Sequence, residues 1–457
     1  MGGHTRPRGI EGTVVRRGDP GFEKLRAGMV WNELKPARSP DVIVVAASER
    51  DVPEAVRLAR SQGMRIAVRA GGHSWCGAPL REGGMLIDLS GLRRCSVDPA
   101  SRTARVQPGV PGGELATRLA RHHLAYPTGH CGSVAMGGYL LGGGLGWNSG
   151  ALGPACASVR RVEAVTADGE VVVCDAREHP DLFWAARGAG PGFFAVVTEF
   201  ELAAHPLPAA IATTTYAFPL DRTEEVARRI AEVSEELPAE VEVTLTLGTA
   251  EPEMWSTPPR PRVVVVKATA FADSRREAVR LTEPLRDCAV TRHAVFRRES
   301  EPTSADSLYG GSSDAWPTSH RFAADTLWSD QDLGTLLAPL AEAVATAPSE
   351  KSLVLAPLRP ASRDEGLLAN MAFSVLGRSY VVPYAIWDDP ARDEANVRWL
   401  REAMGRVEPL GTGHYIAETD LTAAPTRAER SYAPADWRRL REVRARYDPD
   451  GVLHSCP

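Results

Sequence analysis

Two glycine-rich segments constrain the fold of this chain more than any other feature. The first is RAGGHSWCG at residues 69–77, and the second is PTGHCGSVAMGGYLLGGGLGWNSG at residues 127–150. Glycine lets the backbone approach a ligand closely and presents N–H groups to phosphate oxygens. A single Gly-Gly pair is more often a tight turn, but five glycines fall within eight residues at Gly137, Gly138, Gly142, Gly143 and Gly144. The pattern therefore predicts a surface that binds a pyrophosphate-bearing cofactor.

Other familiar nucleotide and hydrolase motifs are missing from the sequence. Only four lysines are present and none follows a glycine, so there is no Walker A loop. The glycines do not fit GxGxxG, which argues against a Rossmann site, and there is no HExxH or GxSxG. Kinase, zinc-protease and serine-hydrolase functions all lose support.

Hydrophobic patterning places the first glycine segment directly after a strand. A short apolar run at 42–46 is followed by S-x-x-D from Ser48 to Asp51, which predicts a capped helix that ends near Gly63. Residues 65–69 alternate as a strand does and lead into the loop with His73. Further strands are expected at 85–89 and 103–107, and a helix at 113–123.

The remainder of the chain divides near residue 207. Before it, the pattern predicts a hairpin at 161–166 and 170–174, a helix at 181–187 and a strand at 194–202. After it, strand-like runs at 212–218, 241–247, 262–270 and 380–387 alternate with polar helical segments. These features indicate an α+β class with a mainly antiparallel sheet covered by helices, closed by a helix at 435–446.

Composition excludes several classes of partner. The net charge is −5 and no basic run occurs, so nucleic acid is not expected. No apolar stretch is long enough to span a membrane, and the first residues lack the apolar core of a secretory signal, so a cytoplasmic protein is expected. Seven cysteines without a CxxC pair support neither a disulfide framework nor a metal site. The excess of arginine over lysine suggests a GC-rich bacterial genome.

Four sequence stretches carry a resemblance to a known family. They are RAGGHS at 69–74, HCGSVAMGGYLLGGGLGW at 130–147, WAARGAGPGFFAVVTEFELAAHPLP at 184–208 and RYDPD at 446–450. Together they resemble the FAD-linked oxidases of the berberine-bridge-enzyme type, in the vanillyl-alcohol-oxidase superfamily with a PCMH-type FAD-binding domain. The resemblance implies an FAD-binding domain from residues 1–207 and 420–457. It also implies a substrate domain from residues 208–419.

The same resemblance implies how the cofactor is held. The histidine that matches His73 bonds to the 8α carbon of the flavin, and in the bicovalent subgroup a cysteine that matches Cys131 bonds to flavin C6. The alternative for Cys131 is a buried thiol, with His73 as the single link. The other expected FAD contacts are Arg69, Ala70, Gly71, Gly72, Ser74, Gly129, Gly132, Ser133, Gly137, Gly138, Gly142, Gly143, Val197 and Tyr447.

Catalytic residues are expected near residue 415. Hydride transfer to flavin N5 needs a base for the accompanying proton. Family members often use a tyrosine here, so Tyr415 is the first candidate. A neighbouring cation or a second tyrosine is expected to lower its pKa. The alternative role of Tyr415 is packing in the core. Tyr139, Glu418 and Tyr432 are the further candidates.

The sequence departs from the family pattern at two positions around this site and in the tail after residue 450, where relatives usually have an asparagine and a longer ending. Ala417 stands where relatives often carry asparagine, and Leu145 where they often carry tyrosine. Met136 falls in the segment expected to control the access of oxygen to the flavin. These differences leave the cofactor interpretation intact and weaken any substrate borrowed from relatives.

Three functions remain open at this point. The first is an oxidase that takes a hydride from an alcohol, sugar or amine carbon of a natural-product-like small molecule and passes electrons to O2. It would act in bacterial secondary metabolism, such as antibiotic biosynthesis, as a monomer or homodimer. The second is a dehydrogenase that uses another electron acceptor. An amine oxidase acting on an aminoglycoside-like antibiotic belongs beside it, because the acidic Glu418 and Asp420 would suit a cationic substrate. The third is a flavin-binding module without catalysis.

Overall fold

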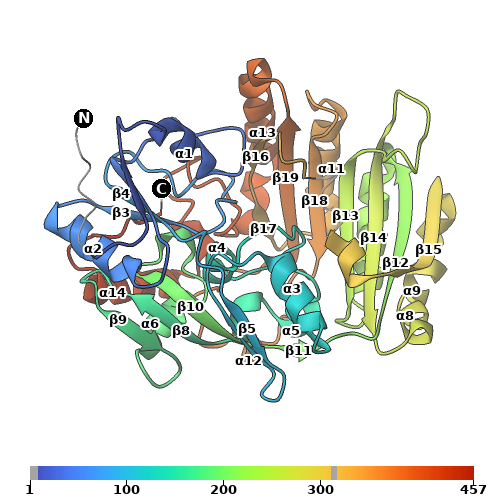
Figure 1. Cartoon of the computed structure of the whole chain (residues 1–457). Coiled ribbons are helices and arrows are strands. Elements are labelled where there is room, and N and C mark those ends of the chain that lie inside the picture. The colour runs from blue at the N-terminus through green and yellow to red at the C-terminus, as the bar shows by residue number, and fades with distance from the viewer. Residues whose placement is uncertain (1–8, 310–315, 457) are drawn as a thin grey trace.

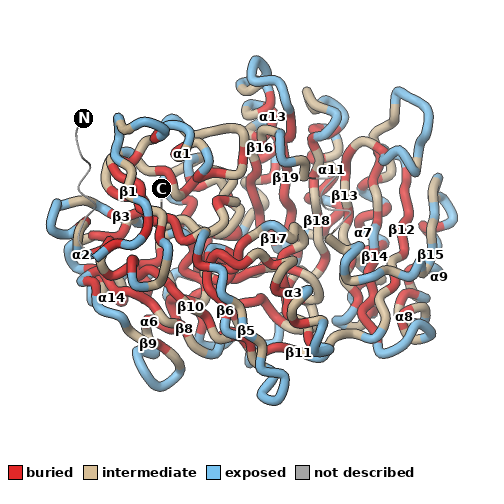
Figure 2. Tube along the Cα trace, in the orientation of Figure 1, coloured by how far each residue is buried: buried red, intermediate tan, exposed pale blue. Residues whose placement is uncertain are grey.

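The first glycine segment emerges from a small parallel sheet. The structure, a computed structural model, describes residues 9–309 and 316–456. The sheet has the order β1-β2-β4-β3, in which β1 is the antiparallel edge. Its apolar strands are buried, and helices pack beside them (Figures 1 and 2). The elements are β1 (Thr13–Arg16), α1 (Phe22–Gly28), β2 (Val42–Val45), α2 (Asp51–Ser61), β3 (Ile66–Arg69) and β4 (Met85–Asp88).

Helix α2 begins as expected, but its cap differs from the prediction. Only half of the S-x-x-D capping box forms: Asp51 accepts the N–H of Ser48 at 3.4 Å, but the Ser48 hydroxyl has no hydrogen-bond partner among the described residues. The buried Asp51 carboxylate also accepts N–H groups from Ala47, Gly12 and Glu11. These backbone donors satisfy the buried carboxylate. The carboxylate also ties α2 to the chain before β1.

A five-stranded antiparallel sheet carries the second glycine segment. Its order is β5-β6-β10-β8-β9, and β5 was missed by the sequence patterns because only alternate residues of this edge strand are half-buried. Helices α6 and α14 pack together near it (Figure 1). The elements are β5 (Cys95–Asp98), β6 (Thr103–Val106), α3 (Gly112–Ala120), β7 (Leu124–Ala125), α4 (Met136–Leu141), α5 (Ser149–Leu152), β8 (Val159–Val165), β9 (Val171–Cys174), α6 (Pro180–Ala186), β10 (Val196–Ala203), β11 (His205–Pro206) and α14 (Pro434–Tyr447).

A large antiparallel sheet forms the other side of the molecule (Figure 1). Its order is β15-β12-β14-β13-β18-β19-β17-β20, with β16 also paired to β19. The strands are β12 (Ala210–Pro219), β13 (Val241–Thr249), β14 (Arg262–Ala272), β15 (Phe296–Thr303), β16 (Arg321–Ala324), β17 (Leu327–Ser329), β18 (Leu353–Leu358), β19 (Ser379–Trp387) and β20 (Gly411–Gly413). The helices are α7 (Thr223–Ser234), α8 (Arg275–Leu281), α9 (Glu283–Asp287), α11 (Leu333–Ala345), α12 (Glu365–Leu368) and α13 (Asp393–Val407).

The two faces of this sheet have different roles. On β13, Val243, Leu245 and Leu247 point into a core shared with α7, α11 and α13. Their neighbours Glu242, Thr244 and Thr246 point to the opposite face, as the two-residue period of a strand requires. The second face therefore stays polar and lines a cavity. Within residues 9–309 and 316–456, no helix combines the length and apolar character needed to cross a membrane.

The C-terminal tail returns to the small sheet. Asp448 accepts N–H groups from Val452 and Leu453 and pairs with Arg444, so the chain turns back directly after α14. Leu453 then forms a parallel bridge with Ile66 of β3. In Figure 1 the C terminus consequently lies beside the N-terminal strands.

Candidate functional site: an FAD cavity

One large cavity lies between the glycine-rich loops and the polar face of the large sheet. Its volume is about 1770 Å³. Pockets for drug-sized ligands usually measure about 300–1000 Å³, so this cavity has room for a large cofactor and a substrate together. The lining comes from both glycine segments, from β12, β13, β14, β18 and β19, and from residues 415–421.

His73 projects into the cavity from the loop after β3. Its ring stacks on Trp31 with the centroids 5.1 Å apart. Burial, together with the positive charge of Arg69, lowers the pKa of His73 to about 4. The imidazole is therefore neutral at physiological pH, and only the neutral ring has a lone pair for bonding to an electrophilic flavin carbon.

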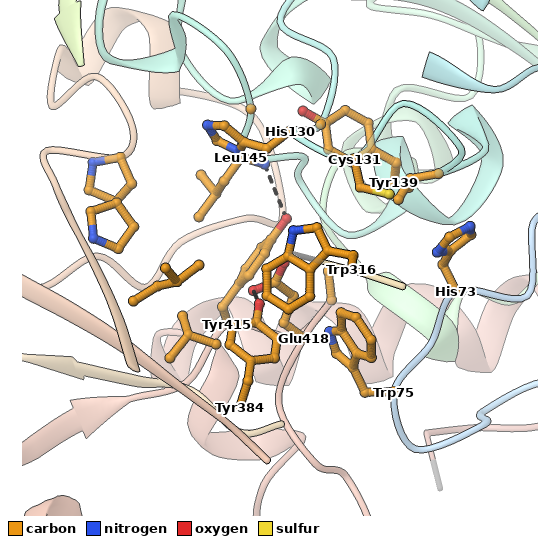
Figure 3. Close-up of a pocket in the computed structure, with 18 of the residues that line it drawn as sticks. His73, Trp75, His130, Cys131, Tyr139, Leu145, Trp316, Tyr384, Tyr415 and Glu418 are labelled. Carbon is orange, nitrogen blue, oxygen red and sulfur yellow. Dashed lines mark hydrogen bonds between the residues drawn. The ribbon is translucent and has the colours of Figure 1, made fainter. Parts of the chain in front are cut away.

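Cys131 lines the same cavity from the second glycine segment. Its Sγ lies 3.2 Å from Ser133 Oγ, and the side chain is half-buried. In Figure 3, His73 and Cys131 lie on one side of the pocket, while Tyr415, Glu418 and Tyr384 lie on the other. The two residues expected to hold the flavin thus come together from segments almost sixty positions apart in the sequence.

The glycines have two different functions in this arrangement. A side chain at Gly71 would approach Ala135 to 2.8 Å, and one at Gly137 would meet both Ala70 and Pro108 at 2.8 Å. These two glycines allow the loops to pack against each other. At Gly138, by contrast, nothing lies within 4 Å of an added Cβ, and the residue lines the cavity. Gly138 therefore supplies bare backbone to a ligand, which fits a cofactor held by N–H groups.

Glu418 stands opposite this cofactor side. Its carboxylate accepts hydrogen bonds from the hydroxyls of Tyr380 and Tyr384 at 3.3 and 3.4 Å. Burial raises the pKa of Glu418, although Tyr380, His130 and Tyr384 partly oppose this. A carboxylate whose pKa is raised toward neutrality is suited to accepting a proton during a reaction.

Tyr415 has a different environment from the one expected. Its hydroxyl oxygen accepts the N–H groups of Gly144 at 3.0 Å and Leu145 at 3.2 Å. The dashed line in Figure 3 marks the bond from Leu145. Burial and the charge of Glu418 raise its pKa, and no cation among the described residues offsets them. The pKa of Tyr415 is thus raised rather than lowered, although the N–H groups of Gly144 and Leu145 partly oppose this, and its hydroxyl fixes the last glycine cluster.

His130 forms a charged pair across the cavity. Its Nε2 lies 2.6 Å from Glu242 Oε1 on β13, and Glu242 Oε2 accepts the N–H of Asn148. Burial disfavours the charged imidazole, but Glu242 outweighs it and the pKa of His130 is raised. The ring also packs edge-on against Trp147 at 4.3 Å.

Not all expected residues line the cavity. Those that do are His73, Cys131, Ala70, Gly71, Gly72, Ser74, Gly129, Gly137, Gly138, Val197, Tyr139, Tyr415 and Glu418. Those that do not are Arg69, Gly132, Ser133, Gly142, Gly143 and Tyr447. Arg69 pairs instead with Asp88 at 2.9 Å, and the Tyr447 hydroxyl donates to Asp181. Met136 is fully buried and also lies off the cavity, as does Tyr432, whose hydroxyl donates to the carbonyl of Ala189.

Several lining residues were not found by sequence reasoning. They are Trp31, Trp75, Trp316, Tyr380, Tyr384, Glu242 and His454. The strand containing Tyr380 and Tyr384 was located correctly, but its period of two does not reveal which face meets the cavity. Trp75 directly follows the His73-Ser74 pair, so its place next to the predicted cofactor loop was an available signal.

Comparison with known proteins agrees with this architecture. A protein-family model described as an FAD binding domain matches residues 40–175. The FAD-linked oxidoreductase nodO of Hypoxylon pulicicidum is 31% identical over 414 residues, which cover 89% of this chain and 88% of the relative. The FAD-linked oxidoreductase penO of Penicillium crustosum is 30% identical over 448 residues, covering 98% and 96%.

Two solved structures share the fold. 6-Hydroxy-D-nicotine oxidase from Arthrobacter nicotinovorans superposes with a TM-score of 0.82 at 24% identity, covering 97% of this chain and 96% of the other. Berberine bridge enzyme from Eschscholzia californica gives 0.81 at 19% identity, with the same coverage. The fold and the cavity thus define an FAD-dependent oxidoreductase. The chain belongs to the FAD-linked oxidoreductases, and its fold is the one seen in berberine bridge enzyme.

Proposed function

We propose that the chain is an oxidase that holds FAD by two covalent bonds, through His73 and Cys131. The substrate is a small molecule that loses a hydride from a carbon bearing oxygen or nitrogen, and O2 takes the electrons to give H2O2. One observation carries the proposal: His73 and Cys131 line the same cavity as Glu418, although they come from distant segments. Residues 1–207 and 420–457 serve the cofactor, and residues 208–419 the substrate.

The residues around the cavity have separate roles in this reaction. Bound FAD supplies the acceptor for the hydride at N5. Glu418 accepts the proton that the substrate releases, and the hydroxyls of Tyr380 and Tyr384 keep its carboxylate in place. Tyr415 holds the Gly144–Leu145 backbone and so fixes the shape of the wall near the proton acceptor.

Protein precipitated by acid tests the attachment. A yellow pellet is expected, because covalently bound flavin stays with the denatured chain. His73→Ala and Cys131→Ala should each leave one bond, and the double variant should release all FAD to the supernatant. Cys95→Ala, a half-buried cysteine off the cavity, is the matched control and should behave as wild type. A colourless wild-type pellet would refute covalent attachment.

Peroxide formation tests the acceptor separately. Once a substrate that bleaches the flavin is found, one equivalent of H2O2 per turnover under air is expected. Flavin reduction without peroxide, relieved by an artificial acceptor, would identify a dehydrogenase instead.

A further inference from the structure

The polar face of the large sheet carries one lysine among threonines. Lys267 of β14 lines the cavity, and its side chain is exposed. In the strand register, Thr215 of β12 and Thr244 of β13 stand directly opposite Lys267, one on each side. Side chains at opposite positions of neighbouring strands have Cβ atoms about 4.5–5.5 Å apart. The ammonium group and the two hydroxyls therefore form one polar cluster, which we call the lysine patch.

The acidic residues on this face already have other partners. Among the described strand residues of the large sheet, Glu242 and Glu301 are the two glutamates that line the cavity. Glu242 pairs with His130 at 2.6 Å, and Glu301 lies 3.8 Å from Arg298. No ion pair within residues 9–309 and 316–456 includes Lys267. The ammonium group is thus available to an anionic ligand.

The lysine patch suits a carboxylate better than a phosphate. A carboxylate carries one negative charge, which the single ammonium group balances, and its two oxygens can accept hydrogen bonds from the threonine hydroxyls. A phosphate monoester carries a charge of about −1.5 to −2 near neutral pH, so one ammonium group would leave part of it unbalanced.

An apolar strip separates the lysine patch from Glu418. Tyr380 and Tyr384, which bond to Glu418, belong to β19, and strands β18 and β13 lie between β19 and the β14 strand of Lys267 (Figure 1). Three strand spacings, roughly 14 Å, therefore separate the two strands. The residues through which β18 lines the cavity between them are all apolar: Leu353, Leu355 and Pro357.

We propose that the substrate carries a carboxylate remote from the carbon that is oxidised, and that Lys267 binds this carboxylate together with Thr215 and Thr244. The inference deepens the proposed function and rests on it for the reacting end. The carbon that loses the hydride lies beside Glu418, and an apolar body crosses β18. The carboxylate takes no part in the reaction: it fixes the direction in which the substrate lies, so Lys267 determines specificity.

Binding of an unreactive acid and its neutral analogue tests the site. Decanoate and decanamide have nearly the same shape, and their ten-carbon chains suit the apolar strip, but only decanoate is charged. Titration of the holoenzyme, followed by the fluorescence of the tryptophans that line the cavity, should show about tenfold tighter binding of decanoate. Equal affinity for the two compounds, or no binding of decanoate, would overturn the proposal.

Variants assign the preference to the lysine patch. Lys267→Gln should reduce the preference for decanoate to about twofold or less, whereas Lys267→Arg keeps the charge and should retain the preference. Thr244→Val removes one hydroxyl donor and should lower the preference to about threefold, which provides a second test should Lys267→Gln fold poorly. Lys351→Gln is the matched control, because Lys351 lines the same cavity but precedes β18.

The outcomes separate this inference from the proposed function. A preference that survives both Lys267→Gln and Thr244→Val, or that is lost equally in Lys351→Gln, would refute the assignment to the lysine patch. Binding of decanoate requires no turnover, and acid precipitation of the same samples reports flavin attachment. A failure of carboxylate binding is therefore distinguishable from a failure of the proposed oxidase.

Discussion

Replacing Tyr415 by phenylalanine removes one oxygen atom and leaves two backbone N–H groups, of Gly144 and Leu145, without their acceptor. A buried donor left unsatisfied costs about 1–3 kcal/mol. Gly144 is buried, whereas Leu145 borders the cavity and water can reach it, so its contribution is at the lower limit. We expect the free energy of unfolding to fall by about 2–4 kcal/mol.

Urea titration of the flavin-loaded protein measures this loss, with Tyr139→Phe as the control. The Tyr139 hydroxyl donates one hydrogen bond, to the carbonyl of Pro127 at 2.6 Å, so its removal should cost about 1 kcal/mol. Both tyrosines are buried and line the cavity. The reasoning is refuted if Tyr415→Phe is as stable as wild type, or more stable than Tyr139→Phe.

The same variant separates a structural tyrosine from a catalytic base. A general base typically contributes about 10²–10⁴-fold to the rate. Since the Tyr415 hydroxyl is held as a neutral acceptor, flavin reduction in Tyr415→Phe should slow by less than about tenfold. A loss of a hundredfold or more with unchanged stability would identify Tyr415 as the base after all.

Other variants probe different parts of the site. Glu418→Gln should slow flavin reduction by about 10²–10⁴-fold and abolish the rise of this rate with pH. The wild-type carboxylate must ionise, above its raised pKa, before it can accept a proton. Stopped-flow rates of flavin reduction across pH test this, and an unchanged dependence of the rate on pH contradicts it. Gly137→Ala should lower the free energy of unfolding by about 1–3 kcal/mol through its clash with Ala70, whereas Gly138→Ala should keep apoprotein stability and lower the FAD content. Urea unfolding of the apoprotein and the bound flavin per chain measure these two effects. Equal changes in the two variants would contradict the distinction between the glycines. Burial opposes ionisation of Glu408, but His414 and Arg427 outweigh it and lower its pKa to about 2. Its stabilisation is thus complete above pH 4.5 and is lost as the pH falls toward 2, so Glu408→Gln should be less stable at pH 7 and approach wild type near pH 2 in thermal unfolding.

The glycine segments predicted the cofactor loops because close backbone approach leaves a local signature in the sequence. They did not predict which glycine has open space beside it: Gly137 and Gly138 both line the cavity, yet Gly137 is buried in a loop contact and Gly138 is exposed to the cavity. Many strand positions followed from hydrophobic patterning, but β1, β5, β15 and β18 were not predicted. Of these, β5 was missed because its burial is weak.

Sequence reasoning placed Tyr415 first among the candidate bases and Glu418 behind it, because the electrostatic environment of Glu418, which we propose as the base, is built by distant residues. His130, Tyr380 and Tyr384 reach Glu418 from other segments of the chain, and no local pattern predicts their meeting. For the same reason, the sequence predicted the Ser48 hydroxyl as a helix cap. The Asp51 carboxylate instead accepts backbone N–H groups, and two of these belong to the distant residues Glu11 and Gly12.

The return of the C-terminal tail makes the cavity wall a late product of synthesis. Leu453 and His454 line the cavity that also contains His73, and Leu453 bridges to Ile66 beside that loop. The ribosome makes His73 and Cys131 long before it makes this part of the wall. The wall is therefore complete only after synthesis has passed residue 454, and a cofactor that bound earlier would meet an unfinished site.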